Sequence, residues 1–229
     1  MTEEKLAFYQ SAFPVWEDLT PQQRDLLLSS TIEKTFPKGA ALHQGGQDCS
    51  GLVIVYSGQL RGFIFSGSGK EITLYRLFDR DMCLFTASCL LKNIHFDIHV
   101  TAEKETQALP IPTGVYQQLM ESSLAVADYT GQLMASRFSD VMWVMEQVLF
   151  ASFDQRLAIF LEAQSNVDGS DTLHMTQEEI ARHLGSAREV VTRMLKYFQA
   201  EGIVELFRGG LTIIDRKKLH RLAQPQNPS

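Results

Sequence analysis

Three charged residues near the C-terminal end, Arg188, Glu189 and Arg193, have side chains that suit the reading of DNA bases. An arginine can donate two hydrogen bonds to guanine in the major groove, and a glutamate can accept one from cytosine. Each good contact of this kind contributes roughly 1–3 kcal/mol to discrimination between bases. Other polar residues nearby are expected to hold the phosphates of the DNA backbone; they are Thr176, Ser186, Thr192, Lys196 and Arg208.

Two short helices are expected to carry these side chains. Thr176 and Glu179 have the spacing of a capping box, which predicts a helix that Gly185 ends. Ser186 and Glu189 have the same spacing and predict a second helix directly afterwards. Two helices joined by a glycine-containing turn, the second with cations on its outer face, are typical of a helix-turn-helix. The alternative for each charge is an ordinary solvated helix surface, and for Glu189 it is capping alone.

A β-hairpin is expected after the two helices. Residues 202–207 and 211–214 are rich in β-branched and apolar side chains, and Arg208 begins the glycine turn between them. Such a hairpin would form a wing whose tip offers Arg208 to phosphate.

Charge is distributed unevenly along the chain. The net charge is −6, but residues 176–222 hold nine Lys and Arg against six Asp and Glu, so that segment carries +3 and the remainder −9. A mildly basic end on an acidic body is expected where only one end meets phosphate.

The region from residue 31 to about residue 111 predicts an antiparallel β-barrel or sandwich. Short runs rich in β-branched and aromatic residues recur there, with Ser66 to Gly69 as a tight turn between two of them. The expected strands cover residues 40–44, 51–56, 59–65, 71–77, 95–102 and 106–111. A helix over Pro21–Ser30, capped by Thr20, is expected to pack on this domain.

A long helix is expected to follow the β domain. Apolar or small residues recur there at alternating spacings of four and three, as in a coiled-coil seam; they are Ala127, Gly131, Met134, Phe138, Val141, Met145 and Val148. We expect the last five to form a dimer interface, and a core helix of a monomer is the alternative. The chain is therefore predicted to be an α+β protein with a β-barrel domain (1–121), a dimerisation helix (122–151) and a winged helix-turn-helix domain (152–229).

The segment from Gln177 to Leu195 resembles the helix-turn-helix of the cyclic-AMP receptor protein and fumarate-nitrate reduction regulator (CRP/FNR) superfamily. The shared pattern is Arg188-Glu189-x-x-x-Arg193, and the resemblance extends through residues 36–39 and 58–61, the long helix and the wing. It implies a jelly-roll sensor domain and a homodimer that binds a pseudo-palindromic operator on double-stranded DNA under the control of a small-molecule effector. RNA polymerase is a further possible partner of such a regulator.

The sensor region departs from the pattern of the cyclic-nucleotide members. Those members place a Gly-Glu pair and an Arg-Ser run around the ribose and the cyclic phosphate. The matching stretches here, residues 82–91 and 95–99, contain neither, and Asp97 would repel a phosphate. The first 48 residues hold no cysteine, so the four-cysteine iron-sulfur arrangement is missing as well. An effector other than cyclic AMP is expected.

Three kinds of effector remain open, and the cofactor is unknown. The first is a small, partly apolar or aromatic ligand in a pocket near Phe85, Cys89, Phe96 and Ile98. The second is thiol chemistry at Cys83 and Cys89, which would make the chain a redox-responsive regulator and requires an accessible thiolate of low pKa. The third is haem or another metal at His95, His99 or a cysteine. A sensor that binds no ligand is a fourth possibility.

Other function classes are less well matched by the sequence. A barrel-shaped metal enzyme would need converging histidines, and no His-x-His occurs, so we expect no enzyme and no metal site. A regulatory module that docks on a protein would leave the helix-turn-helix unexplained. No apolar run reaches the roughly 20 residues of a membrane helix, and no signal peptide is evident, so a cytoplasmic location without membrane contact is expected.

Overall fold

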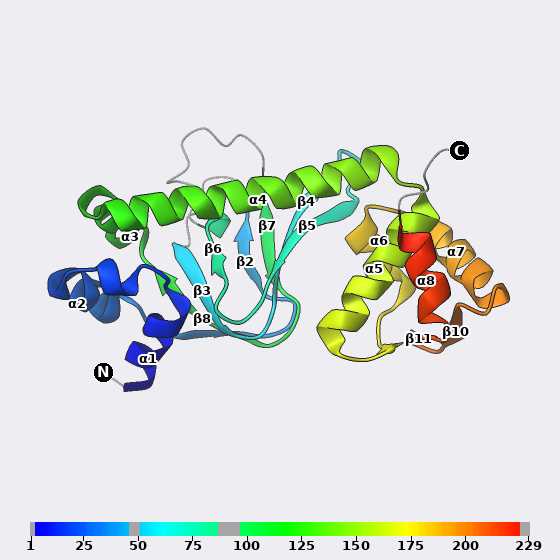
Figure 1. Cartoon of the computed structure of the whole chain (residues 1–229), viewed down its shortest axis with the longest axis horizontal. Helices are drawn as coiled ribbons and strands as arrows, with labels where there is room; N and C mark the ends of the chain where they lie inside the picture. The colour runs from blue at the N-terminus through cyan, green and yellow to red at the C-terminus, as the bar shows by residue number, and fades with distance from the viewer. Residues whose placement is uncertain (1–2, 46–50, 87–96, 225–229) are drawn as a thin grey trace. The chain divides into compact units, whose positions relative to one another are not determined.

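The computed structural model describes residues 3–45, 51–86 and 97–224. The chain separates into two compact units (Figure 1). The first unit comprises Met1–Ile64 and Leu74–Val141, and the second comprises Phe65–Thr73 and Met142–Ser229.

Among the described residues, two four-stranded antiparallel sheets form the β part of this domain, a jelly-roll as predicted. Their strand orders are β1-β8-β3-β6 and β2-β7-β4-β5. The strands are β1 (Lys34–Phe36), β2 (Ala41–Gln44), β3 (Leu52–Ser57), β4 (Leu60–Phe65), β5 (Glu71–Leu77), β6 (Met82–Cys83), β7 (His99–Ala102) and β8 (Thr106–Ile111). The pairing of β3 with β8 sets Ile54 opposite Leu109, and both side chains are buried. Of the strand predicted over residues 95–102, the first two residues lie outside the described residues.

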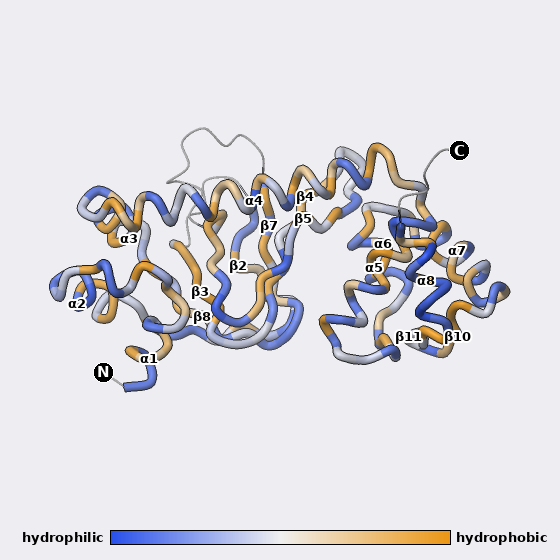
Figure 2. The backbone as a smooth tube through the Cα atoms, in the orientation of Figure 1, coloured by the Kyte–Doolittle hydropathy of each residue, from blue (hydrophilic) through white to orange (hydrophobic). Residues whose placement is uncertain are grey.

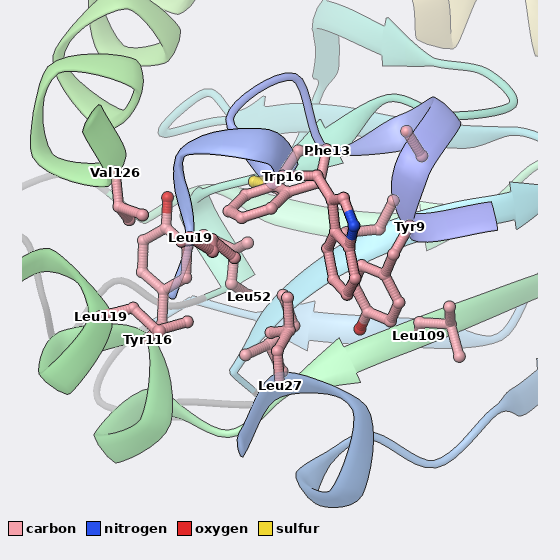
Figure 3. Packing of buried hydrophobic residues seen from close by; sticks show 14 of the residues in the cluster. Tyr9, Phe13, Trp16, Leu19, Leu27, Leu52, Leu109, Tyr116, Leu119 and Val126 are labelled. Atoms are coloured by element: carbon pink, nitrogen blue, oxygen red, sulfur yellow. The ribbon is translucent and has the colours of Figure 1, made fainter. Parts of the chain in front are cut away.

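Besides α4 (Leu124–Phe150), the helical segments described in the first unit are α1 (Glu3–Ala12), the 3-10 helix η1 (Trp16–Asp18), α2 (Pro21–Ser30) and α3 (Thr113–Ser122). The predicted cap of α2 is confirmed, since Thr20 and Gln23 form a reciprocal capping box. Helix α1 was not predicted, and it contributes Tyr9 to the core. Figure 3 shows this core, in which large side chains from α1, α2, α3 and the strands pack together; it includes Tyr9, Phe13, Trp16, Leu27, Leu52, Tyr116 and Leu119.

Helix α4 (Leu124–Phe150) is the long helix that the heptad spacing predicted. Near its start, Val126 and Thr130 are buried, and the Thr130 hydroxyl hydrogen-bonds the Tyr116 hydroxyl at 2.7 Å. Its later turns carry large apolar side chains that remain exposed, and Figure 2 shows hydrophobic residues recurring along them; they are Phe138, Met142, Trp143, Met145, Val148, Leu149 and Phe150.

Within the described residues, the second unit contains the end of α4, four further helices and a small sheet of order β10-β11-β9. Its elements are α5 (Phe153–Asp168), β9 (Thr172–Leu173), α6 (Gln177–Leu184), α7 (Arg188–Ala200), β10 (Val204–Phe207), β11 (Gly210–Ile213) and α8 (Arg216–Ala223). The predicted hairpin is confirmed as β10 and β11, with Val204 opposite Ile213. The core of this unit is formed by residues that are almost fully buried, including Leu157, Leu161, Ile180, Val191, Leu195, Phe198 and Leu211.

No helix within the described ranges is long and apolar enough to cross a lipid bilayer.

Candidate nucleic-acid interface

Helix α6 begins and ends as its sequence predicts. The Thr176 hydroxyl accepts a hydrogen bond from the backbone N–H of Glu179 at 3.2 Å, and the Glu179 carboxylate accepts one from the backbone N–H of Thr176 at 2.8 Å. At the other end, Gly185 adopts a left-handed conformation with φ of 63°, and its N–H donates to the carbonyl of Ala181. Both ends of this short helix are therefore fixed by local hydrogen bonds.

The prediction of a second capping box at Ser186 is wrong. The N-cap of α7 is Ala187, which has no side-chain cap, and the helix begins at Arg188. The backbone N–H of Ser186 instead donates to the carbonyl of Ala181 at 3.0 Å, so Ser186 belongs to the turn that closes α6. Helix α7 therefore starts one residue later than the spacing suggested.

Helix α7 presents its charged residues to solvent. Val191, Leu195 and Phe198 are buried on its inner side. Arg188, Glu189, Arg193 and Lys196 are exposed. The side chains of these four residues make no ion pair or hydrogen bond within the described part of the chain. They can therefore meet an incoming partner without breaking an existing contact.

The Thr192 hydroxyl lies between the two helices. It is close to the Gln177 side-chain oxygen of α6 and lies 2.8 Å from the carbonyl of Arg188. A hydroxyl has one proton to donate, so these two acceptors compete for it. Thr192 thus helps to hold α7 against the start of α6. Gln177, which sequence reasoning missed, shares this role; its place directly after the N-cap was the only available signal.

The hairpin of β10 and β11 lies beside both helices. Arg208 is exposed at its tip, next to Gly209 with φ of 89°. An open cleft of about 410 Å³ lies where the hairpin, the start of α6 and the start of α7 meet, and Thr176, Gln177 and Arg188 are among the residues that line it. The arrangement therefore brings the predicted phosphate-binding residue Thr176 and the predicted base-reading residue Arg188 to one place.

The predicted effector residues lie in two groups. Phe85 and Ile98 are buried, and the Phe85 ring stacks on the Tyr75 ring with centroids 5.7 Å apart. Cys89 and Phe96, together with His95, lie outside the described residues. The described residues contain no group of three or more side chains that could hold a metal ion.

Cys83 is buried in the first unit. Burial raises the pKa of its thiol, although hydrogen bonds with Thr86 and Tyr75 act in the opposite direction. A raised pKa leaves less thiolate than an ordinary cysteine has at neutral pH, whereas the redox hypothesis requires more.

The predicted dimerisation residues differ in exposure along α4. Met134 is half-buried and packs against the core of the first unit, and Val141 is also half-buried. Phe138 is 66% exposed, and Met145 and Val148 are each 45% exposed. Residues that the seam did not include are exposed as well; they are Trp143, Leu149 and Phe150.

Comparison with known protein families gives two matches. Residues 155–222 match the Crp-like helix-turn-helix domain, and residues 33–123 match the cyclic nucleotide-binding domain. The first match covers α6, α7 and the hairpin, and the second covers both four-stranded sheets.

Individual relatives agree with these matches. The crystal structure of a transcriptional regulator described as CRP/FNR family, from Eubacterium rectale, is 50% identical, covers 93% of this chain and 99% of its own, and superposes with a TM-score of 0.90. The cyclic AMP receptor protein of Thermus thermophilus is 26% identical over 92% of this chain and 96% of its own. Transcriptional activator protein FnrA of Stutzerimonas stutzeri is 28% identical over 81% of this chain and 78% of its own. Full-length similarity and the helix-turn-helix geometry lead to one conclusion: this chain belongs to the CRP/FNR family of transcription regulators.

Proposed function

We propose that the chain acts as a homodimer, binds a pseudo-palindromic operator through α7, and responds to an effector other than cyclic AMP. The observation that carries the proposal is the state of Arg188, Glu189 and Arg193, which are exposed on one short helix and have no side-chain partner within the described residues. Guanidinium and carboxylate groups held in this way can pair with base edges in the major groove. Thr176, Ser186, Lys196 and Arg208 would hold the phosphates, and Thr192 would support them from between α6 and α7.

The exposed side of α4 supports the homodimer. Phe138, Trp143 and Phe150 are each more than half exposed. A large apolar surface of this kind commonly marks an interface between proteins. A second copy of α4 would cover it symmetrically, and a twofold dimer would match the symmetry of a pseudo-palindromic operator.

The interior of the first unit supports an effector other than cyclic AMP. Tyr75 and Phe85 occupy that interior as a stacked pair, and both rings are buried. The sequence there also lacks the Gly-Glu pair and the Arg-Ser run that the cyclic-nucleotide members use. We therefore expect a ligand of different chemistry, with Phe85 and Ile98 near it.

Selection from a library of random DNA duplexes tests the DNA-binding part of the proposal. The full chain would be used at moderate salt, with and without cyclic AMP and candidate effectors, and enriched duplexes would be sequenced. We expect two inverted half-sites whose centres lie about 10–10.5 base pairs apart, because each α7 of a dimer reads one half-site. Enrichment of a single unrepeated site would contradict the dimer, and no enrichment under any condition would contradict the regulator.

Thermal-shift measurements test the effector part. A ligand at one hundred times its Kd stabilises a protein by about 2.7 kcal/mol. We expect no shift with cyclic AMP. A saturable shift with cyclic AMP would show that the altered pocket still binds the ordinary ligand of cyclic-nucleotide members.

A further inference from the structure

Tyr75 of β5 is a buried tyrosine, 5% exposed, whose hydroxyl lacks a strong partner. Its ring lies directly against Gly62 of β4, where an added Cβ would be 2.2 Å from the tyrosine Cζ, so only glycine allows this position. The ring also stacks on Phe85. The hydroxyl makes no hydrogen bond to any nitrogen or oxygen of the described residues, and the Cys83 thiol beside it is a weak partner. A buried hydroxyl in this state is costly for a folded protein.

Arg137 of α4 approaches the same place. Its side chain is only 12% exposed, and the centre of its guanidinium group lies 5.3 Å from the centre of the Tyr75 ring. Its Nη1 donates to the Asp140 carboxylate at 2.7 Å. Its Nε is buried and has no hydrogen-bond partner within the described ranges. The edge formed by Nε and Nη2 is therefore available.

The Tyr75 hydroxyl and the Arg137 guanidinium could be satisfied by the same kind of hydrogen-bond partner. A guanidinium edge can only donate hydrogen bonds, so its missing partner is an acceptor, and the tyrosine hydroxyl can donate to the same group. A carboxylate has two oxygens that can accept both N–H groups of a guanidinium edge and still accept from a hydroxyl. Asp140 already occupies Nη1, but an arginine has five N–H donors and can serve a second carboxylate from its other edge.

We propose that Tyr75 and Arg137 form a binding subsite for the carboxylate group of a small ligand, whose apolar part contacts Phe85. The identification of this ligand as the effector rests on the proposed function, whereas carboxylate binding at Tyr75 and Arg137 does not. Because Arg137 stands on α4, the ligand would bind between β5 and the helix that we expect to form the dimer. Binding would then put the ligand in contact with Arg137 of α4.

The first experiment measures carboxylate binding to the full chain by calorimetry and thermal shift. The probes are acetate and benzoate, and their neutral isosteres acetamide and benzamide are the matched controls. We expect at least one carboxylate to bind, and its amide to bind at least tenfold more weakly. Failure of both carboxylates to bind at millimolar concentration would overturn the proposal, as would equal binding of an acid and its amide.

Two variants locate the site. Tyr75→Phe and Arg137→Met should each weaken carboxylate binding at least tenfold, whereas Arg221→Ala on α8 should leave it unchanged. Unchanged binding in Tyr75→Phe and Arg137→Met would place the carboxylate elsewhere and overturn the proposal.

The ligand-free melting temperature gives a readout that does not depend on the probe. Tyr75→Phe should leave it unchanged or raise it, because the substitution removes a buried hydroxyl that lacks a strong partner. A clear decrease would show that the hydroxyl already has a structural acceptor, for example one supplied by a second copy of the chain, and would contradict the proposal.

DNA binding is measured separately, so that the proposed carboxylate subsite and the proposed regulator function can be refuted independently. Carboxylate binding without any effect on operator affinity would refute the effector role and leave the subsite. Carboxylate binding by a protein that binds no duplex would refute the proposed function alone.

Discussion

The two units of the chain use polar side chains in opposite ways. In the second unit, Arg188 and Arg193 stand exposed on α7 without side-chain partners among the described residues. In the first unit, Tyr75 is buried and the Arg137 side chain is only 12% exposed, and the Tyr75 hydroxyl and the Arg137 Nε lack nitrogen or oxygen partners among the described residues. Exposed donors can meet a large, rigid and highly charged partner such as a duplex, whereas buried donors can be reached only by a small molecule. Unpaired donors therefore mark both proposed sites, and burial indicates which partner each accepts.

The largest expected effect concerns the independence of the two units. Leu195→Ala in the second unit and Leu52→Ala in the first each remove a side chain that is essentially fully buried. Each should destabilise its own unit by about 2–5 kcal/mol, because a cavity replaces well-packed atoms. Differential scanning calorimetry should show a different transition moving in each variant. If both variants lower one common transition by the same amount, the two units unfold together and are not independent.

Disruption of the exposed side of α4 should separate DNA binding from folding. Phe138→Glu places a charge in the proposed dimer interface, whereas Gln132→Glu adds the same charge on the same helix at another exposed position. The monomeric variant would bind one half-site at a time, so operator affinity should fall on the order of 100-fold. Sedimentation equilibrium and fluorescence anisotropy measure the two properties. A Phe138→Glu variant that stays dimeric would show that the interface lies elsewhere.

Within α7, base reading and phosphate binding should respond differently to substitution. Arg188→Ala should cost about 1–3 kcal/mol on the selected operator and relax specificity at one base pair. Lys196→Ala should weaken operator and random DNA alike and reduce the salt slope by about 1. Titrations of both duplexes over a range of salt concentrations distinguish them. If Arg188→Ala lost the same affinity for operator and for random DNA, Arg188 would not be a base-reading residue.

The smallest expected effect concerns the capping boxes of α2 in the first unit and α6 in the second. Thr20→Ala and Thr176→Ala each remove the hydroxyl of a reciprocal capping box and should destabilise their units by about 1 kcal/mol. Only Thr176→Ala should also weaken DNA binding, because Thr176 lines the cleft beside Arg188. Chemical denaturation and anisotropy give the two readouts. A matching loss of DNA affinity in Thr20→Ala would mean that general destabilisation explains the effect.

Local signals in the sequence predicted much of the second unit. A capping box and a glycine fixed the ends of α6 because both act through hydrogen bonds within a few residues. The same reasoning failed at Ser186, where two local patterns compete and the turn that closes α6 uses the backbone N–H of Ser186. Spacing alone cannot decide between such patterns.

The interior of the first unit could not be predicted in the same way. Tyr75 was placed correctly in a strand, but its approach to Arg137 depends on how β5 and α4 pack, and these elements are about 60 residues apart in sequence. Helix α1 was missed because its burial comes from contacts with distant elements, such as the Phe8 ring with the Tyr56 ring and the Tyr9 hydroxyl with the Thr31 hydroxyl. Tertiary contacts therefore define the proposed effector subsite, whereas local contacts define the proposed DNA interface.

The most direct test of the central claim compares the affinity of the full chain for its selected operator with its affinity for a scrambled duplex of the same composition. Fluorescence anisotropy at moderate salt would be measured for the unsubstituted protein, for Arg188→Ala, and for Arg221→Ala, which removes the same charge from α8. We predict an operator preference of at least about 1000-fold for the unsubstituted protein and for Arg221→Ala, and a clearly smaller preference for Arg188→Ala. Equal affinity of the unsubstituted protein for both duplexes, with every candidate effector tried, would contradict the account.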